Sequence, residues 1–242
     1  MWLERVAGLP CEHVYSFLSL IILISTSTCQ RLTDVERAQI LKAHLEVRED
    51  VQPSASNMLL MHYSMALERL AADWAARCVL AHPNPRRYPQ YRGIGQNIAL
   101  IAGFKPYLTE SVCGWKRESR FYRYSNNTCS HKCGHYIQLV WAKSSQLGCA
   151  RQRCDGLNPG WRNPQYLTVC QYRPGVTFSG VRPYLSGASC SRCPEGYSCY
   201  HKQCVRHHQP SRTHPTEHLK VVDNVFVPEC LPDSFYSISL FA

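Results

Sequence analysis

A strong helical periodicity runs through residues 64–80, SMALERLAADWAARCVL, where apolar side chains recur at steps of three and four residues. This spacing places the apolar side chains on one face, so it predicts an amphipathic helix whose buried stripe ends at Cys78. The segment that follows, HPNPRRYPQY at residues 82–91, contains three prolines. Because proline lacks the backbone N–H that a helix interior needs, this segment is predicted to be a loop.

Two further helices are predicted, one before and one after this helix and its loop. Thr33 and Glu36 have the spacing of a capping box, so a helix is expected to begin near Asp34. Residues 109–122, TESVCGWKRESRFY, place large side chains on one side of a helix, with Thr109 as the expected N-cap.

Two strands are predicted in the second half of the chain. QLGCAR at residues 146–151 and QYLTVCQY at residues 165–172 are short and carry apolar and β-branched residues. The turn-rich stretch DGLNPGWRNP separates them. Helices followed by a few strands around one core indicate an α+β, layered fold rather than a doubly wound parallel sheet.

Cysteine usage and the N-terminus both indicate secretion. The chain has 14 cysteines, which brace a secreted fold as disulfides but would be a liability in a reducing compartment. Residues 14–25, VYSFLSLIILIS, form an apolar run that is too short to span a bilayer but suits a signal peptide, which is expected over residues 1–29. No other segment reaches membrane length, so an extracellular location with no transmembrane span in the mature chain is predicted.

The composition changes towards the C-terminus. After a main domain at residues 30–183, the segment 184–206 holds four cysteines within CSRCPEGYSCYHKQC and has few apolar residues, so only cross-links can stabilise it. Residues 207–242 begin with a polar stretch rich in proline and histidine and are predicted to be a flexible tail.

Charge gives a weaker indication of partners. Lysine and arginine outnumber aspartate and glutamate by 27 to 17, a balance that favours acidic partners such as glycosaminoglycans or anionic lipid. The sequence contains no run of five or six basic residues, so a mildly basic, solvated surface is the preferred interpretation. Nucleic acid is not expected as a partner.

Seven motifs occur in a fixed order between Glu36 and Cys204: PSASNMLLMHY, AARCVLAH, GIGQNIAL, the W-x-x-E of Trp115 and Glu118, CGHYIQLVWA, LGCARQRC and TVCQYRPG. In these motifs the chain resembles the CAP superfamily, the cysteine-rich secretory, antigen 5 and pathogenesis-related proteins. It is most similar to the peptidase inhibitor 16 type, which joins a CAP domain to a short CPxGYxC-like segment. The resemblance implies an α-β-α sandwich, with an antiparallel sheet between helices, followed by a small disulfide-rich hinge-like segment.

The resemblance also implies a cleft tetrad, which matches His82, Gln96, Glu118 and His135 in this sequence. Gln96 stands where the family motif carries a glutamate, and a neutral amide is neither a general base nor a good ligand for a divalent cation. The two imidazoles, of His82 and His135, are candidate zinc ligands, with Glu118 as a third ligand or as the acceptor that orients a ring. The preferred alternative is a structural hydrogen-bond network with no required cofactor.

Disulfide pairing is likewise implied by the resemblance, as Cys78–Cys154, Cys149–Cys170, Cys129–Cys133, Cys190–Cys199 and Cys193–Cys204. Removal of the signal peptide leaves two further cysteines. Cys113 and Cys230 pair with each other, or one of them supports a disulfide-linked dimer, or Cys113 is a buried free thiol, and the last of these is preferred. Asn126 lies in the only N-x-S/T sequon and is a predicted glycosylation site.

Two classes of function follow. The first is a non-enzymatic secreted protein that acts as a peptidase inhibitor or binds an extracellular protein, a lipid or a sterol. In the inhibitor case, Arg86 and Arg87 of the loop 82–91 would attract a trypsin-like protease. The preferred interpretation of this loop is that it only delivers His82 to the cleft. The alternative is a divalent-metal-dependent hydrolase that uses His82, His135 and Glu118, although no serine lies in a G-x-S-x-G elbow and the cysteines are assigned to disulfides.

Overall fold

The computed structural model describes residues 31–177, 180–206, 222–230 and 237–241. The predicted signal peptide and residues 207–221 of the predicted tail lie outside the described residues. Within the described part, no helix has the length and apolar character needed to cross a membrane.

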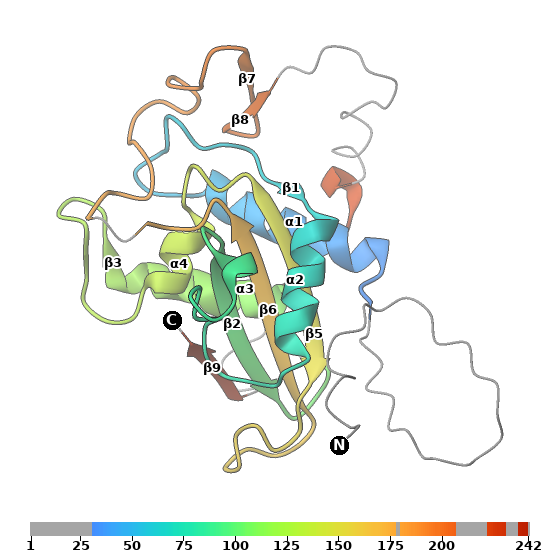
Figure 1. Cartoon of the computed structure of the whole chain (residues 1–242). Helices are drawn as coiled ribbons and strands as arrows, with labels where there is room; N and C mark the ends of the chain where they lie inside the picture. The colour runs from blue at the N-terminus through green and yellow to red at the C-terminus, as the bar shows by residue number, and fades with distance from the viewer. Residues whose placement is uncertain (1–30, 178–179, 207–221, 231–236, 242) are drawn as a thin grey trace, which may run out of the picture.

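A five-stranded sheet forms the middle layer of the molecule (Figure 1). Its strands, in spatial order, are β1 (His62–Tyr63), β5 (Gln146–Arg153), β6 (Gln165–Arg173), β2 (Gly95–Ala102) and β9 (Ser237–Phe241). Only the short β1 runs parallel to its neighbour, and the other pairings are antiparallel.

Helices cover both faces of this sheet. The first face packs on α2 (Met65–Ala75), and the second on α1 (Asp34–Glu49), α3 (Leu108–Arg117) and α4 (Gly134–Leu139). Side chains alternate along β2, so Ile98 and Leu100 pack with α2 while Ala99 joins the opposite core. The expected α-β-α sandwich is confirmed.

Short elements complete the described chain. Two single-turn 3₁₀ helices, two small hairpins and the loops between them surround the sandwich: η1 (Pro89–Tyr91), η2 (Glu118–Phe121), β3 (Tyr122–Arg123) with β4 (Thr128–Cys129), and β7 (Tyr197–Tyr200) with β8 (Gln203–Arg206). The last hairpin lies in the predicted hinge-like segment and is cross-linked by its cysteines.

Local sequence signals set two of the helix starts. The capping box of α1 is present: Thr33 Oγ1 accepts from the Glu36 N–H at 3.1 Å, and Glu36 Oε2 accepts from the Thr33 N–H at 2.9 Å. The helix α2 starts after Ser64, whose side chain accepts from the Leu67 N–H. It ends at Ala75, before the predicted Cys78, because Cys78 adopts a left-handed conformation with φ of 49°.

The third helix differs from its prediction at both ends. It begins at Leu108, and Tyr107 precedes it without a side-chain cap, so the prediction of Thr109 as N-cap is wrong. Thr109 is buried within the first turn of the helix, where its hydroxyl has no hydrogen-bond partner. From Glu118 the chain tightens into η2 rather than continuing as an α-helix to residue 122.

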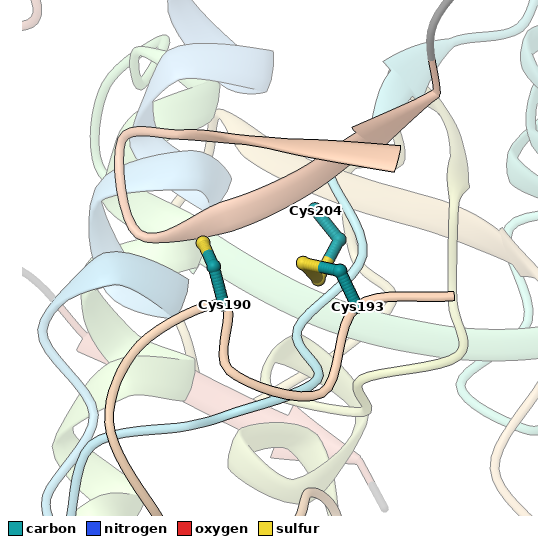
Figure 2. A group of neighbouring side chains, drawn as sticks. All are labelled: Cys190, Cys193 and Cys204. Atoms are coloured by element: carbon teal, nitrogen blue, oxygen red, sulfur yellow. A yellow bond between two sulfur atoms is a disulfide. The ribbon is translucent and has the colours of Figure 1, made fainter. Parts of the chain in front are cut away.

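Six disulfides cross-link the described residues. Five have the pairing that the family resemblance implies, and Figure 2 shows Cys190, Cys193 and Cys204 of the hinge-like segment. The sixth joins Cys113 of α3 to Cys230, 117 positions away in the sequence. Cys113 is therefore not a free buried thiol.

The prediction of a flexible tail over 207–242 is wrong for two of its segments. Residues 222–230 dock on α1, where Lys42 Nζ donates to the carbonyls of Asp223 at 2.7 Å and Val225 at 2.9 Å. Val222 is buried against the same core. Residues 237–241 form β9 at the edge of β2. Burial of valines and the Cys113–Cys230 bond offset the entropy lost when these segments become ordered.

A buried arginine ties α1 to the rest of the core. The Arg48 side chain, 1 % exposed, donates to five backbone carbonyls at 2.8–3.3 Å, those of Leu59, Leu139, Trp141, Ala142 and Ser144. Burial lowers the pKa of Arg48 to about 9, which leaves the guanidinium charged at neutral pH. The carbonyl dipoles around it offset the desolvation of that charge.

Replacement of this arginine should be severely destabilising. In Arg48→Met, several buried carbonyls lose their donor, so we expect the free energy of unfolding to fall by about 3–5 kcal/mol. Denaturant unfolding of the disulfide-intact protein measures this change. Arg69→Met, on an exposed position of α2, is the matched control and should change stability by less than about 0.5 kcal/mol. Equal denaturation midpoints for the two variants would contradict the role of Arg48.

Candidate functional site

The four predicted cleft residues come from four separate elements. His82 begins the exposed loop after α2, and Gln96 is the second residue of β2. Glu118 begins η2, and His135 is the second residue of α4. The structure joins them as two hydrogen-bonded pairs.

The inner pair consists of Glu118 and His135, which are 4 % and 1 % exposed. Glu118 Oε1 accepts from His135 Nδ1 at 2.7 Å, and its Oε2 accepts from the backbone N–H groups of His135 at 3.0 Å and Tyr136 at 3.3 Å. The His135 ring stacks on Trp115, with ring centres 6.1 Å apart. The carboxylate thus holds the first turn of α4 and fixes the orientation of the imidazole.

The outer pair consists of His82 and Gln96. His82 Nδ1 lies 2.8 Å from Gln96 Oε1, and because an amide oxygen only accepts, Nδ1 carries the proton. His82 is exposed, whereas the Gln96 Nε2 atom is buried without a hydrogen-bond partner among the described residues. A glutamate at this position would carry a second acceptor oxygen in place of Nε2. The glutamine instead carries an N–H donor there, and this donor has no partner among the described residues.

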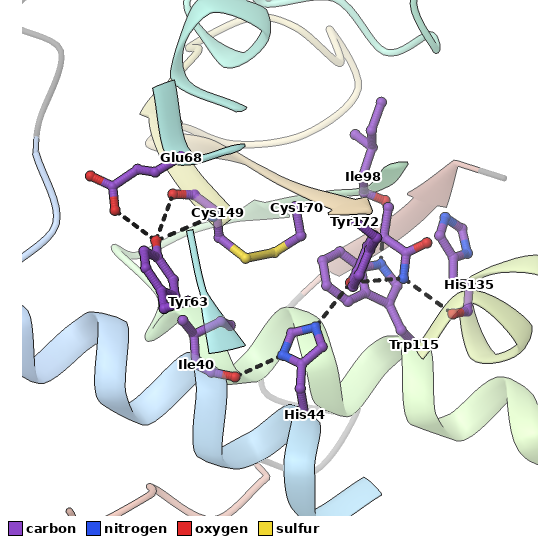
Figure 3. Close-up of a disulfide and its surroundings, with 11 residues drawn as sticks. Ile40, His44, Tyr63, Glu68, Ile98, Trp115, His135, Cys149, Cys170 and Tyr172 are labelled. Atoms are coloured by element: carbon purple, nitrogen blue, oxygen red, sulfur yellow. Dashed lines mark hydrogen bonds between the residues drawn. A yellow bond between two sulfur atoms is a disulfide. The ribbon is translucent and has the colours of Figure 1, made fainter. Parts of the chain in front are cut away.

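A chain of buried polar groups supports His135 from the core (Figure 3). Asn97 Nδ2 donates to the His135 carbonyl at 3.1 Å and to the Tyr172 hydroxyl at 3.2 Å. Tyr172 in turn contacts His44 Nε2 at 2.9 Å, and His44 Nδ1 donates to the Ile40 carbonyl at 2.7 Å. This chain of contacts connects α1, the sheet and α4. Asn97, Tyr172 and His44 were not predicted from the sequence, where the only signal for them is the position of Asn97 beside Gln96 in GQN.

Gln138, the glutamine of CGHYIQLVWA, was also missed. It is 4 % exposed, its Oε1 accepts from the Val176 N–H at 3.0 Å, and its Nε2 donates to Ser144 Oγ at 3.0 Å. The side chain passes next to Gly95, where any Cβ would collide with it. Gln138 therefore connects α4 to Ser144 and to the chain that follows β6.

The predicted loop at residues 82–91 is held in one conformation. The Asn84 carbonyl accepts from the N–H groups of Arg87 and Tyr88 at 3.0 and 2.8 Å, and Asn84 Oδ1 accepts from the Arg86 N–H at 2.9 Å. The Tyr88 ring packs edge-on against Trp74, with ring centres 5.3 Å apart. Both arginines at the tip are exposed.

Zinc bound by protein alone takes at least three nitrogen, sulfur or oxygen ligands. Among the described residues, one group of three such side chains lies within 4.8 Å, namely Cys190, Cys193 and Cys204 (Figure 2). These sulfurs are consumed by disulfides, and zinc needs thiolates. His82, Glu118 and His135 do not form such a group, so the residues do not fit a closed site with three protein ligands. Zinc at the two imidazoles stays a prediction.

Comparison with known proteins identifies the family. The family model described as "CAP: Cysteine-rich secretory protein family" matches residues 36–172, so the chain belongs to this family. GLIPR1-like protein 1 of Mus musculus is 39% identical over 170 residues, 68% of this chain and 70% of that protein. Peptidase inhibitor 16 of Mus musculus is 33% identical over 190 residues, 78% of this chain but only 37% of that protein.

Solved structures give the same result for the fold. Na-ASP-1 has a TM-score of 0.59 and 26% identity, covering 74% of this chain and 49% of that one. NaASP2 with Zn2+ has a TM-score of 0.59 and 25% identity, covering 72% and 96%. The protein is thus a CAP superfamily member of the secreted type, as its motifs predicted.

The buried His44 should make the core sensitive to acid. Burial lowers the pKa of His44 from the ordinary 6.5 to about 4, so the folded protein keeps it neutral while the unfolded chain protonates it. Its contribution to stability is therefore complete above pH 6.5 and is lost as the pH falls towards 4. Two to three pKa units correspond to about 3 kcal/mol. Unfolding free energies measured from pH 7 to pH 4 should show this loss. The loss of unfolding free energy should be smaller in His44→Gln. Identical pH profiles for the wild type and this variant would contradict the assignment of the acid sensitivity to His44.

Restoring a carboxylate beside His82 should increase zinc affinity. In Gln96→Glu, an anionic oxygen replaces the amide oxygen that contacts His82 Nδ1, so we expect affinity for zinc to rise about tenfold or more by calorimetric titration. The matched control is Gln90→Glu, an exposed position with the same change of charge. If both variants bind zinc as the wild type does, the outer pair is a structural contact rather than a ligand set.

Proposed function

We propose that this protein is a non-enzymatic extracellular binding module that presents the loop 82–91 to a partner protein. The observation that carries the proposal is the rigid, exposed tip of this loop, where Arg86 and Arg87 lie on a turn organised by Asn84. Relatives named peptidase inhibitor 16 make a protease the partner class to test first.

Several contacts at the base of the loop restrict its motion. Trp74 Nε1 donates to the Ala81 carbonyl at 2.9 Å, and the Arg77 guanidinium lies 4.9 Å from the centre of the Tyr88 ring. The Cys78–Cys154 disulfide anchors the preceding turn to the chain after β5. A loop that is already ordered loses less entropy on binding, which is the physical advantage of a rigid inhibitory or recognition loop.

The cleft geometry gives the hydrolase alternative no support. Both oxygens of Glu118 are engaged by N–H groups of His135 and Tyr136, so the carboxylate serves the fold of α4. Gln96, as an amide, supplies no general base. This arrangement supports the structural interpretation of the tetrad.

Lipid or sterol binding is the second candidate, and one pocket favours it. A cavity of about 400 Å³ lies between α1, α3 and residues 222–230. Its lining combines Val47, Val112 and Phe226 with two cations, Lys42 and Lys116, and two carboxylates, Glu46 and Glu229. The apolar part of the wall suits the apolar portion of an amphiphile, the two lysines and two glutamates balance in charge, and the volume is that of a small-molecule site.

Inhibition assays against trypsin-like serine proteases test the first proposal. We expect Arg86→Ala combined with Arg87→Ala to weaken inhibition tenfold or more, because trypsin-like pockets bind a basic side chain by charge. Arg69→Ala combined with Lys143→Ala removes two exposed cations elsewhere and should leave inhibition unchanged. If the secreted, disulfide-intact protein inhibits no protease but binds a fluorescent fatty acid, the second candidate replaces the first.

A further inference from the structure

A pocket beside the inner cleft pair has a strongly basic lining. It measures about 250 Å³ and lies where the end of α3 and η2 meet the loop before α4, with Ile238 of β9 contributing to its wall. The lining holds three cationic side chains and one imidazole: Arg117, Arg120, Lys132 and His131. Among the described residues that line it, the only acidic group is Glu118.

The charges around the pocket do not cancel. Glu118 is buried and directs both carboxylate oxygens to the N–H groups of His135 and Tyr136. Arg120 and Lys132 are exposed and form no ion pair with a carboxylate in the described part of the chain. The pocket therefore presents a local excess of positive charge, within a chain whose formal net charge is +10.

The basic side chains are attached to an ordered frame. His131 and Lys132 lie in the short loop closed by the Cys129–Cys133 disulfide. The Ser130 N–H in the same loop donates to the Phe121 carbonyl at 2.9 Å, which holds the loop against η2. Little of the binding free energy would be lost in organising such a site.

Two of the polar groups contact an aromatic ring. The Arg120 guanidinium carbon is 4.7 Å from the centre of the Phe121 ring, and the His131 ring centre is 5.0 Å from it. The ring offers a half-buried apolar surface, and the guanidinium fork matches the oxygens of an anion bidentately. A sugar ring that carries a sulfate group presents both complementary features, an apolar C–H face and a localised negative charge.

We propose that this pocket, lined by Arg120, Phe121, His131 and Lys132, binds a sulfated unit of an extracellular glycosaminoglycan. The sulfate contacts Arg120 and Lys132, and the sugar ring lies against Phe121. Because the protein is of the secreted type, this polyanion is accessible to it. The site is separate from the loop 82–91, so a glycan and a protein partner can bind together.

A charge-matched pair of variants tests the proposal, using immobilised heparin and calorimetry with a defined heparin oligosaccharide. Arg120→Ala combined with Lys132→Ala should lower affinity about tenfold or more, as expected when two charge-assisted contacts are lost. The slope of log affinity against log salt should become shallower by about two, by the counterion-release argument used for nucleic acids. Arg69→Ala combined with Lys143→Ala removes one arginine and one lysine from exposed positions elsewhere and should keep wild-type affinity to within about twofold.

Three results would overturn the proposal. Equal losses in the two double variants would show that heparin responds to the overall field rather than to this pocket. Equal competition by poly-L-glutamate of matched charge would show that the site recognises charge without a sulfated sugar. Absence of heparin binding by the wild-type protein at physiological salt would remove the ligand class altogether.

Phe121→Leu, which keeps every charge, should weaken heparin binding but not competition by inorganic sulfate.

Discussion

A guanidinium placed in the core without a carboxylate partner is the constraint on which the rest of this structure depends. The Arg48 side chain extends from α1 to the end of α4 and the segment that follows it. There it donates to the carbonyls of Leu139, Trp141, Ala142 and Ser144, and its fifth acceptor is the Leu59 carbonyl. Carbonyls at the end of a short helix would otherwise be buried without donors. The same side chain thus satisfies the C-terminal end of α4 and sets the distance between α4 and α1.

The position of His135 follows from this constraint at one end of α4 and from Glu118 at the other. Glu118 accepts the N-terminal N–H groups of the helix, and Asn97 holds the His135 carbonyl from the sheet. Glu118 and His135 match the family cleft by motif, and they also stabilise α4, a helix of six residues that is too short to be stable alone. In this protein the inner pair of the tetrad, Glu118 and His135, therefore also contributes to the folding of α4.

The success of sequence reasoning here depended on whether the signal was local. The capping box of Thr33 and the periodicity of α2 are local, and both predicted real helices. The stretch GQNIALIA forms strand β2, but a short apolar run in a sequence does not distinguish a buried strand from a helix. Family motifs supplied the four cleft residues, whereas their division into two pairs, the contacts of His44 and the docking of residues 222–230 depend on tertiary packing. Nothing in the local sequence around Arg48 indicates its five acceptors.

The strand β9 has a consequence for how the protein is made. It covers the outer edge of β2, and its pairing of Ser237 with Ala102 joins segments that are synthesised far apart in time. Until β9 is synthesised, the backbone N–H and C=O groups on the outer edge of the apolar stretch 98–102 lack this partner strand, and such an edge can pair with other strands. This edge is therefore the last part of the sheet to gain its partner during synthesis. A chain truncated after the cysteine-rich hairpin would keep most of the sandwich, yet would expose this strand edge as a template for aggregation.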